Sequence, residues 1–349
     1  MRGVGTKTAG MTASDPHAAS LILRYRRRLI RKKLLWRAFR SRHALTLTSD
    51  KRAAMRPGMI LAVAVLRNEE DRLPFFLDHY RRLGIGHFLM VDNASTDGST
   101  ALLHRQPDVT VWRTAASYKA ARFGVDWMNW LKTRYAHGHW VVVADIDELL
   151  IYPDWEARDL SQLTPWLDAR GHRMMGALML DMYPKGAPDA QTYLPGQDPM
   201  EVLQWFDAHG YWVQRQPKID ALWLQGGIRA RKFFADRPER APTLNKIPLV
   251  KWKRGYAFVN ATHSGLPAAL NQTWTTPVSG ALLHTKFLPG TARRAQEEKH
   301  RAEHFQTADA YADYYDRLTD SPDLWDGSAT RYLGWQQLLD LGLLMRGDW

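Results

Sequence analysis

Residues 140–150 read Trp-Val-Val-Val-Ala-Asp-Ile-Asp-Glu-Leu-Leu, an apolar run that leads into three acidic side chains. The run Val-Val-Val-Ala has no polar break and predicts a central strand covered on both faces, the usual state of a parallel sheet. Positions i and i+2 of a strand face the same way, so we expect Asp145 and Asp147 to present two carboxylates together at the sheet's carboxyl edge. Such a pair suits Mg²⁺ or Mn²⁺, which share their ligands between carboxylates and substrate phosphates. The alternative is a strand-end turn with solvated acids.

The composition excludes several classes of protein. At 349 residues, with 45% hydrophobic and 24% charged residues, the chain can bury a sizeable core. It has no cysteine, so metal ligands must be Asp, Glu or His, and a reducing compartment is compatible with the sequence. No apolar run approaches the roughly 20 residues that span a bilayer, and no N-terminal segment resembles a secretory signal. We expect a cytoplasmic protein, soluble or peripheral on the inner face of the cytoplasmic membrane.

The net charge of +12 is concentrated at the N-terminus. Residues 1–57 hold 15 Lys and Arg against Asp15 and Asp50, a local balance of +13, whereas the remainder is nearly neutral. Within this arm, the pattern of Leu21–Arg42 mixes apolar and basic residues at helical spacing and predicts a basic amphipathic helix. Three uses are open: binding to anionic lipid headgroups, binding to a polyanion such as nucleic acid, or packing on the body with solvated arginines. We favour lipid over packing and expect no nucleic acid, because no known nucleic-acid module accompanies the charge.

After Arg56-Pro57-Gly58 the pattern alternates between strands and helices. The expected strands lie at 59–66, 87–91, 109–112 and 140–144, and the expected helices at 71–83, from 99 to about 105, and 118–134. This order predicts an α/β fold with a parallel, doubly wound sheet flanked by helices. From residue 291 the sequence turns helical and charged, with a last helix expected at 332–344. We therefore expect an arm at 1–57, a catalytic domain at 58–290 and a helical C-terminal cap at 291–349.

Three polar loops follow strands of this predicted sheet, at Arg67–Glu70, Asp92–Asp97 and Asp145–Glu148. Loops at the carboxyl ends of parallel strands converge, so we expect one site built from all three. The first loop, Arg-Asn-Glu-Glu, is not the glycine-rich phosphate cradle of a P-loop or Rossmann site. The three polar loops are better explained by a nucleotide site in which acidic groups hold the base and ribose and a metal ion holds the diphosphate.

The series Val65–Glu70, Val91–Ser99 and Ala144–Leu149 resembles a family 2-type glycosyltransferase of the GT-A fold. The resemblance implies sugar transfer from a nucleoside-diphosphate donor, with Mn²⁺ or Mg²⁺ as cofactor. It covers residues 59–150, and the order and spacing of the three motifs are more specific than any one of them. Asp-Asn replaces the commoner double acid after the second strand, and the Gln-x-x-Arg-Trp motif of processive synthases is absent. A single transfer to a glycan, lipid-linked or other hydroxyl acceptor is therefore expected rather than polymer synthesis. The resemblance also implies an inverting transfer, as in the synthesis of cell-surface polysaccharide.

The same resemblance implies roles for particular residues. It places Asp92 or Asn93, with Glu69, near the base and ribose, and it makes Arg67 and Asp145 further donor-binding residues. Asp145 and Asp147 match the D-x-D pair, with Asp147 most directly on the metal. These assignments are carried position by position from the three motifs.

The second half carries weaker candidates. Asp181 ends an expected strand at 177–182 and is our candidate for the base that takes the acceptor's proton, although a turn-forming Asp before Pro is an equal alternative. His284 lies on a short apolar strand with Lys286 two residues on, and similar GT-A enzymes draw a third metal ligand from a late histidine. The alternative is a hydrogen-bonded core histidine. His263 is the weaker candidate for metal or base. Lys246 and Lys251, and Arg229 in the segment 225–231, are candidates for phosphate binding or are only solvated.

Two rival functions remain open at this point. A phosphohydrolase of the haloacid dehalogenase type also places D-x-D after a strand and would use Asp145 as its nucleophile. Those enzymes usually carry the motif on the first strand, whereas here it follows the fourth. A non-catalytic adaptor that binds membrane or polyanion through its basic arm would make the acidic loops incidental.

Overall fold

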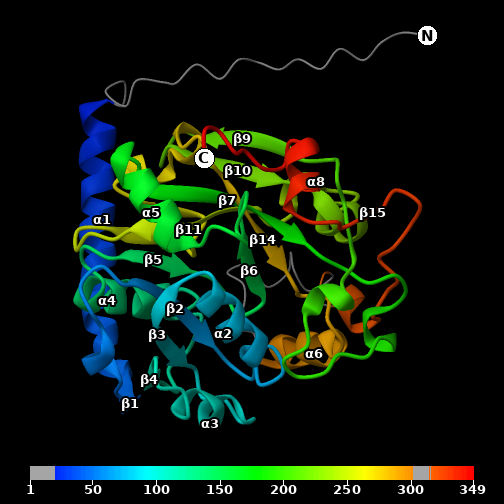
Figure 1. The fold of residues 1–349 in the computed structure, drawn as a ribbon, viewed down its shortest axis with the longest axis horizontal. Helices are drawn as coiled ribbons and strands as arrows, with labels where there is room; N and C mark the ends of the chain where they lie inside the picture. Colours follow the sequence, from blue (N-terminus) through cyan, green and yellow to red (C-terminus); the bar gives the residue numbers. More distant parts are fainter. Residues whose placement is uncertain (1–19, 302–313, 315) are drawn as a thin grey trace.

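The computed structural model describes residues 20–301, 314 and 316–349, and its centre is a nine-stranded sheet with helices on both faces (Figure 1). Six of the nine strands run in the same direction, and β1, β11 and β6 run against them. The predicted mostly parallel, doubly wound α/β sheet is confirmed. The order across the sheet is β1 (Thr46–Ser49), β4 (Val109–Arg113), β3 (Ile85–Asp92), β2 (Ile60–Leu66), β5 (Trp140–Val143), β11 (Asn245–Lys251), β7 (Met174–Asp181), β14 (Gly280–His284) and β6 (Glu148–Ile151).

Alternate residues of β2 bury themselves against helices on opposite sides of the sheet. Ala62 and Leu66 belong to the core beneath α2, α3 and α5, whereas Leu61, Val63 and Val65 pack with α4. A strand buried on both faces needs no polar alternation, which explains the uninterrupted apolar sequence of β2. The helices are α1 (Leu21–Ser41), α2 (Leu73–Arg82), α3 (Ser99–His104), α4 (Val125–Tyr135), α5 (Leu160–Ala169), α6 (Thr291–Arg301) and α8 (Trp335–Asp340).

Helix α2 ends where the sequence predicts. Leu73, Phe76 and Tyr80 recur at helical spacing and are buried, and Gly84 after the last turn has φ +85°, a conformation that glycine adopts without strain. The predicted helix at 118–134 begins late, at Val125. Residues 122–124 have positive φ, so the backbone cannot continue a right-handed helix through them.

The D-x-D residues lie in a turn rather than on a strand. The chain leaves β5 in the middle of the sheet, turns at 144–147 and enters β6 at the far edge, where the Glu148 N–H donates to the Asp145 carbonyl at 3.0 Å. The expectation that Asp145 and Asp147 share one face of a strand was wrong, because the strand stops at Val143. Their carboxylates therefore have different partners.

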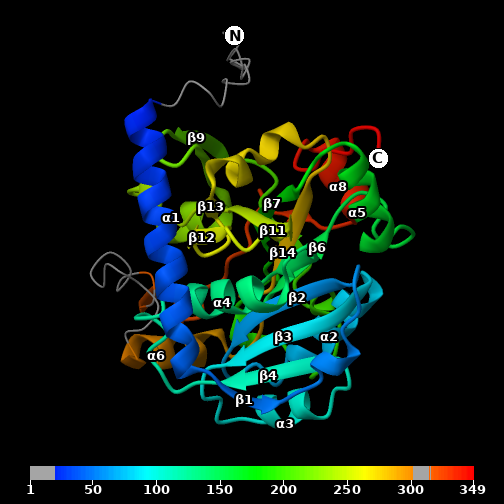
Figure 2. The same ribbon diagram turned by 90° about the vertical axis from the view of Figure 1, so that its left-hand side faces the viewer.

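The N-terminal helix α1 packs along the body beside α4 and β12 (Figure 2). Leu34 and Ala38 are buried, and the Arg37 guanidinium pairs with Asp126 of α4 at 2.9 Å. The packing alternative for this helix is confirmed for its inner face, and β1, also from the predicted arm, joins the edge of the main sheet. No helix in the described ranges combines the length and apolar character needed to cross a membrane.

Three two-stranded sheets and several short helices lie outside the main sheet. The predicted last helix is shorter than expected, at Trp335–Asp340, and residues 302–313 and 315 of the predicted cap lie outside the described part of the chain. The short strands are β8 (Trp205–Phe206), β9 (Trp212–Gln216), β10 (Ala221–Gln225), β12 (Ala257–Asn260), β13 (Ser264–Leu266) and β15 (Thr330–Arg331).

Candidate functional site

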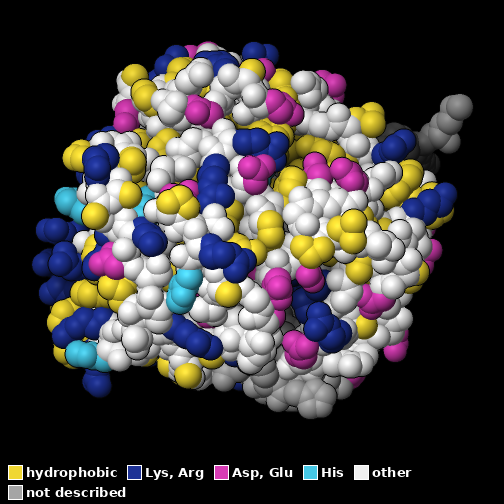
Figure 3. Space-filling view, turned by 60° about the horizontal axis from the view of Figure 1, so that its bottom comes forward, with side chains coloured by type: hydrophobic (Ala, Val, Ile, Leu, Met, Phe, Trp, Pro, Cys, Tyr) yellow, Lys and Arg dark blue, Asp and Glu magenta, His cyan; other side chains and the backbone are white. Residues whose placement is uncertain are grey.

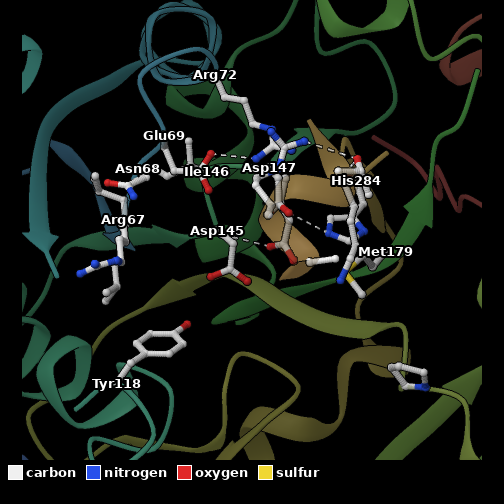
Figure 4. Close-up of a pocket in the computed structure, with 18 of the residues that line it drawn as sticks. Arg67, Asn68, Glu69, Arg72, Tyr118, Asp145, Ile146, Asp147, Met179 and His284 are labelled. Atoms are coloured by element: carbon white, nitrogen blue, oxygen red, sulfur yellow. Dashed lines mark hydrogen bonds and ion pairs between the residues drawn. The ribbon is translucent and has the colours of Figure 1, made fainter. Parts of the chain in front are cut away.

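The loops after β2, β3 and β5 line a pocket of about 350 Å³, together with residues of β7, β11, β14 and α6 (Figure 4). The predicted convergence of the three loops is confirmed. Charged side chains of both signs face each other across the pocket. The acidic lining residues are Glu69, Asp145, Asp147, Glu148 and Glu297, and the basic ones are Arg67, Arg72, Arg229, Lys246, Lys286 and Arg294.

Four side chains form a continuous hydrogen-bonded series, which we call the pocket charge chain: Asp147, His284, Asp181 and Arg229. His284 Nε2 lies 3.1 Å from Asp147 Oδ2, and His284 Nδ1 lies 2.5 Å from Asp181 Oδ1. Arg229 Nε donates to the other oxygen of Asp181 at 2.7 Å. Strand register explains the contact, because His284 of β14 lies directly beside Asp181 of β7.

Burial and charge act against each other in this chain. Burial lowers the pKa of His284, but Asp147 and Asp181 outweigh it and raise that pKa to about 9. Burial raises the pKa of Asp181, but Arg229 and His284 bring it down to about 2. The pKa of Asp147 lies well below its ordinary value because His284, Arg72 and Lys286 outweigh its burial. His284 is therefore held between two carboxylates, one facing the pocket and one behind it.

Asp145 belongs to a second charged group in the same pocket. Lys246 Nζ lies 3.3 Å from Asp145 Oδ2 and 2.7 Å from Glu148 Oε1. Glu148 is 1% exposed, and burial raises its pKa to about 7 against the attraction of Lys246. The Asp145 side chain is 48% exposed, so it is the accessible carboxylate of this group.

Arg67 and Tyr118 lie at the end of the pocket away from His284 (Figure 4), and Asn93, which also lines the pocket, is next to Arg67. Arg67 donates to the backbone carbonyls of Asn93 and Ala94, both at 2.8 Å, and so ties the first loop to the second. The Asn93 amide nitrogen donates to two carbonyls beyond β4, at Thr114 and Ala116, which fixes the orientation of its side chain.

Asp92 lies outside the pocket lining, unlike its neighbour. It is fully buried, and its carboxylate accepts hydrogen bonds from Ser95 N and from the Thr100 hydroxyl. Arg113 lies 3.7 Å from it. Asp92 therefore supports the loop that carries Asn93, a position that differs from the predicted contact with the donor. The reason is the pleat: β3 ends at Asp92, and the side chains of neighbouring residues point to opposite sides.

Arg72 and Arg294 are pocket residues that sequence reasoning missed. The Arg72 guanidinium pairs with Glu69 at 2.9 Å, and its buried Nε has no hydrogen-bond partner in the described structure. Burial and the nearby charge of Arg72 lower the pKa of Arg294 to about 9. The i,i+3 spacing of Glu69 and Arg72 was a local signal of that pair, whereas nothing local distinguishes Arg294 from its charged neighbours on α6.

The remaining candidates divide between the pocket and the surface. His263 lines the pocket, but it is held by the Asn245 carbonyl at 2.6 Å, and burial lowers its pKa to about 3. Lys251 lies away from the pocket and pairs with Asp168 at 2.7 Å. The predicted metal set of Asp145, Asp147 and His284 is brought to one pocket, but the described residues include no cluster of three acidic, histidine or cysteine side chains with metal-binding geometry.

Comparisons with known proteins give no family assignment. No protein-family model matches the sequence, and no curated protein matches it. Among solved structures, a mannosyltransferase from Pyrobaculum calidifontis in complex with GDP-Man and Mn²⁺ is 20% identical, with a TM-score of 0.26 over 47% of this chain and 46% of that one. The alignment thus spans less than half the length of that mannosyltransferase.

Two further solved structures also match at low similarity. A UDP-glucose pyrophosphorylase from Acinetobacter is 11% identical over 74% of this chain and 99% of that one, with a TM-score of 0.29. A 4-diphosphocytidyl-2C-methyl-D-erythritol synthase is 15% identical over 39% of this chain and 67% of that one, with a TM-score of 0.24. At scores this low, a function must follow from the geometry of the site.

Proposed function

We propose that this protein is a glycosyltransferase that moves a sugar from a nucleoside-diphosphate donor to a hydroxyl acceptor, with Mn²⁺ or Mg²⁺ at the diphosphate. The observation that carries the proposal is the pairing of Asp147 with His284 inside a pocket that also gathers Arg72, Lys286 and Arg294. Cations that face a carboxylate and an imidazole suit a ligand that is itself an anion bound to a metal.

Asp147 and His284 would hold the metal. Their facing oxygen and nitrogen are 3.1 Å apart, and the outer nitrogen of His284 is bound by the carboxylate of Asp181. Metal-bound histidines commonly have a carboxylate on their other nitrogen, because it fixes the ring and makes it a better ligand. These residues fit a divalent ion that takes its other ligands from the diphosphate and water, and the ion would neutralise charge on the leaving diphosphate.

Three basic side chains would bind the diphosphate. The orphaned Nε of Arg72 is a buried donor that a phosphate oxygen would satisfy. Arg294 is crowded by the positive charge of Arg72, and an anion between them would relieve that repulsion. Lys286 adds a third cation to the pocket, near enough to Asp147 to help lower the pKa of its carboxyl group.

The nucleoside would occupy the end that carries Arg67, Asn93 and Tyr118. An aromatic ring offers a stacking surface for a base, and Asn93 offers a fixed amide for its edge. Glu69 lies between this end and the cations, near enough to Arg72 to pair with it. The nucleotide's identity would depend on these groups.

Asp181 would orient His284 rather than accept the acceptor's proton. Both of its oxygens are engaged, it is 4% exposed, and it does not border the pocket. The prediction that Asp181 is the base remains untested. An inverting transfer needs a base that reaches the acceptor hydroxyl, and Asp145, a pocket carboxylate whose side chain is 48% exposed, is the candidate for that role.

The proposal is tested by thermal unfolding with UDP, GDP, CDP and dTDP and their sugars, each with Mn²⁺, Mg²⁺ or EDTA. A ligand that binds only the folded state raises the melting temperature by mass action. We expect one nucleotide to stabilise the protein in the presence of metal and not in EDTA, and its sugar to be hydrolysed or transferred in that condition.

Two outcomes would contradict the proposal. A nucleotide that raises the melting temperature equally with and without EDTA would show that it binds without a metal ion. Release of inorganic phosphate from phosphate monoesters, with no nucleotide shift in folded protein, would favour the phosphohydrolase that uses Asp145.

A further inference from the structure

Helix α1 has two apolar stripes, and only one of them is covered by the protein. The inner stripe includes Leu34 and Ala38, which are buried against the body. The outer stripe consists of exposed residues, with Tyr25 at 60%, Leu29 at 47% and Trp36 at 56% exposure. At 100° per residue, Tyr25 and Leu34 lie on opposite sides of the helix. One stripe is enough to pack a surface helix, and the outer stripe is left exposed, with Trp36 stacked on Phe39 of the same helix.

Basic side chains border this outer stripe on both sides. Helical geometry places Arg24 and Arg28 on one side and Arg26 and Lys33 on the other. Within α1 there are nine Lys and Arg and no acidic residue. Among the described residues, only Arg37 of this helix pairs with an acid, whereas Arg27 donates to the carbonyls of Pro217 and Lys218. Figure 3 shows dark blue and yellow side chains gathered together at the edge of the molecule where α1 lies.

We propose that the outer face of α1 binds the surface of an anionic membrane, with its apolar stripe among the acyl chains and its flanking cations on the headgroups. A helix with this arrangement lies in the plane of the interface. The exposed rings of Tyr25 and Trp36 suit the headgroup level. The proposal does not depend on the enzymatic function.

The charge of α1 favours a lipid surface over a second copy of the protein, and the apolar stripe favours it over nucleic acid. Two copies of α1 facing each other would bring together eighteen positive charges with no acid in either helix. A nucleic acid would match the charge but would leave Leu29 and Ile22, which is 67% exposed, without an apolar partner. An anionic bilayer satisfies both the cations and the apolar stripe.

The structure also predicts how the helix binds. Its inner stripe and the Arg37–Asp126 pair already fix α1 on the body, so membrane binding does not have to order the helix first. A free amphipathic peptide gains helix when it binds vesicles, and this protein is expected to bind without a gain in helical circular dichroism.

The test is sedimentation of the full chain with vesicles of phosphatidylcholine alone or with about one-third phosphatidylglycerol. We expect binding on the order of tenfold stronger to the anionic vesicles, falling as salt is raised. The apolar variant Tyr25→Ser/Leu29→Ser/Trp36→Ser and the charge variant Arg24→Gln/Arg28→Gln/Lys33→Gln should each lose most of this binding. All of the changed side chains are exposed, so folding should be retained, as near-ultraviolet circular dichroism would show.

Matched controls change the same chemistry elsewhere on the surface. Leu194→Ser/Leu333→Ser removes exposed apolar residues, and Arg105→Gln/Lys253→Gln/Arg254→Gln removes the same number of charges as the charge variant. Both controls should bind like the original protein. Equal binding to neutral and anionic vesicles would overturn the proposal, as would equal losses in controls and α1 variants. A dimer in light scattering that only the apolar variant dissociates, without vesicle binding, would assign the stripe to a second copy. Binding to RNA but not vesicles would assign it to nucleic acid.

Discussion

The pocket charge chain and helix α1 both concentrate charge, but in opposite surroundings. In the pocket, Asp181 and Arg229 are almost fully buried and pair with each other, and Asp181 also pairs with His284. On α1 most of the charges are exposed, and Arg37 is the one cation of the helix with an acidic partner among the described residues. Water screens charges on a surface, whereas a buried charge keeps most of its interaction with its partner. A single substitution should therefore act strongly in the pocket and weakly on α1.

The largest effect is expected from Arg229→Met. Removing the guanidinium leaves the buried Asp181 carboxylate with His284 alone, and breaking a buried pair costs about 3 to 5 kcal/mol of unfolding free energy. Urea unfolding would measure the loss. The control Arg82→Gln breaks an exposed pair with Asp78 and should cost less than about 1 kcal/mol. If both variants lost the same unfolding free energy, the buried pair in the pocket would be no more important for stability than the exposed pair on the surface.

Asp147→Asn tests the end of the chain that faces the pocket. If Asp147 is a metal ligand, the amide should weaken metal-dependent nucleotide binding by more than the roughly 10- to 100-fold that loss of an outer contact costs. Titration calorimetry with Mn²⁺ and the preferred nucleotide would measure it. Asp78→Asn, on the exposed surface, is the matched control and should bind normally. Unchanged binding in Asp147→Asn would sink the metal assignment.

Asp181→Asn separates the two roles of that residue. As the group that orients His284, its loss should weaken metal affinity about 10- to 100-fold, and transfer should recover in part at high metal concentration. As the base, its loss should lower kcat at every metal concentration and leave metal affinity intact. The dependence of kcat and nucleotide affinity on Mn²⁺ therefore decides between the orienting role and the original prediction.

The smallest effect is expected from Arg28→Gln on α1. The side chain is exposed and has no acidic partner in the described structure, so unfolding free energy should change by less than about 0.5 kcal/mol. Binding to anionic vesicles should fall by less than about tenfold, because the other basic residues of α1 remain. A loss of binding as complete as that of the three-residue charge variant would show that Arg28 occupies a specific lipid site.

Local sequence patterns predicted the parts of the molecule that local physics determines. The uninterrupted apolar run at Ile60–Leu66 marked a strand covered on both faces, and Gly84 marked the end of α2. The late start of α4 was missed because its three left-handed residues include Arg122 and Phe123, which carry no signal of positive φ. The loop at Asp145–Glu148 was predicted, but the directions of its two aspartates were not, because the strand rule for positions i and i+2 does not hold in a turn.

The sequence by itself determined the alternation of strands and helices, the convergence of three polar loops and the basic helix, because periodicity and chain order fix these. Tertiary structure alone decided which side chains meet. Asp147 and His284 are 137 residues apart, and His284 and Asp181 are 103 apart. Their contact depends on β14 lying between β7 and β6 in one register, and no local pattern encodes the pairing of distant strands. Tertiary structure likewise decided which apolar side of α1 packs on the body and which side stays exposed.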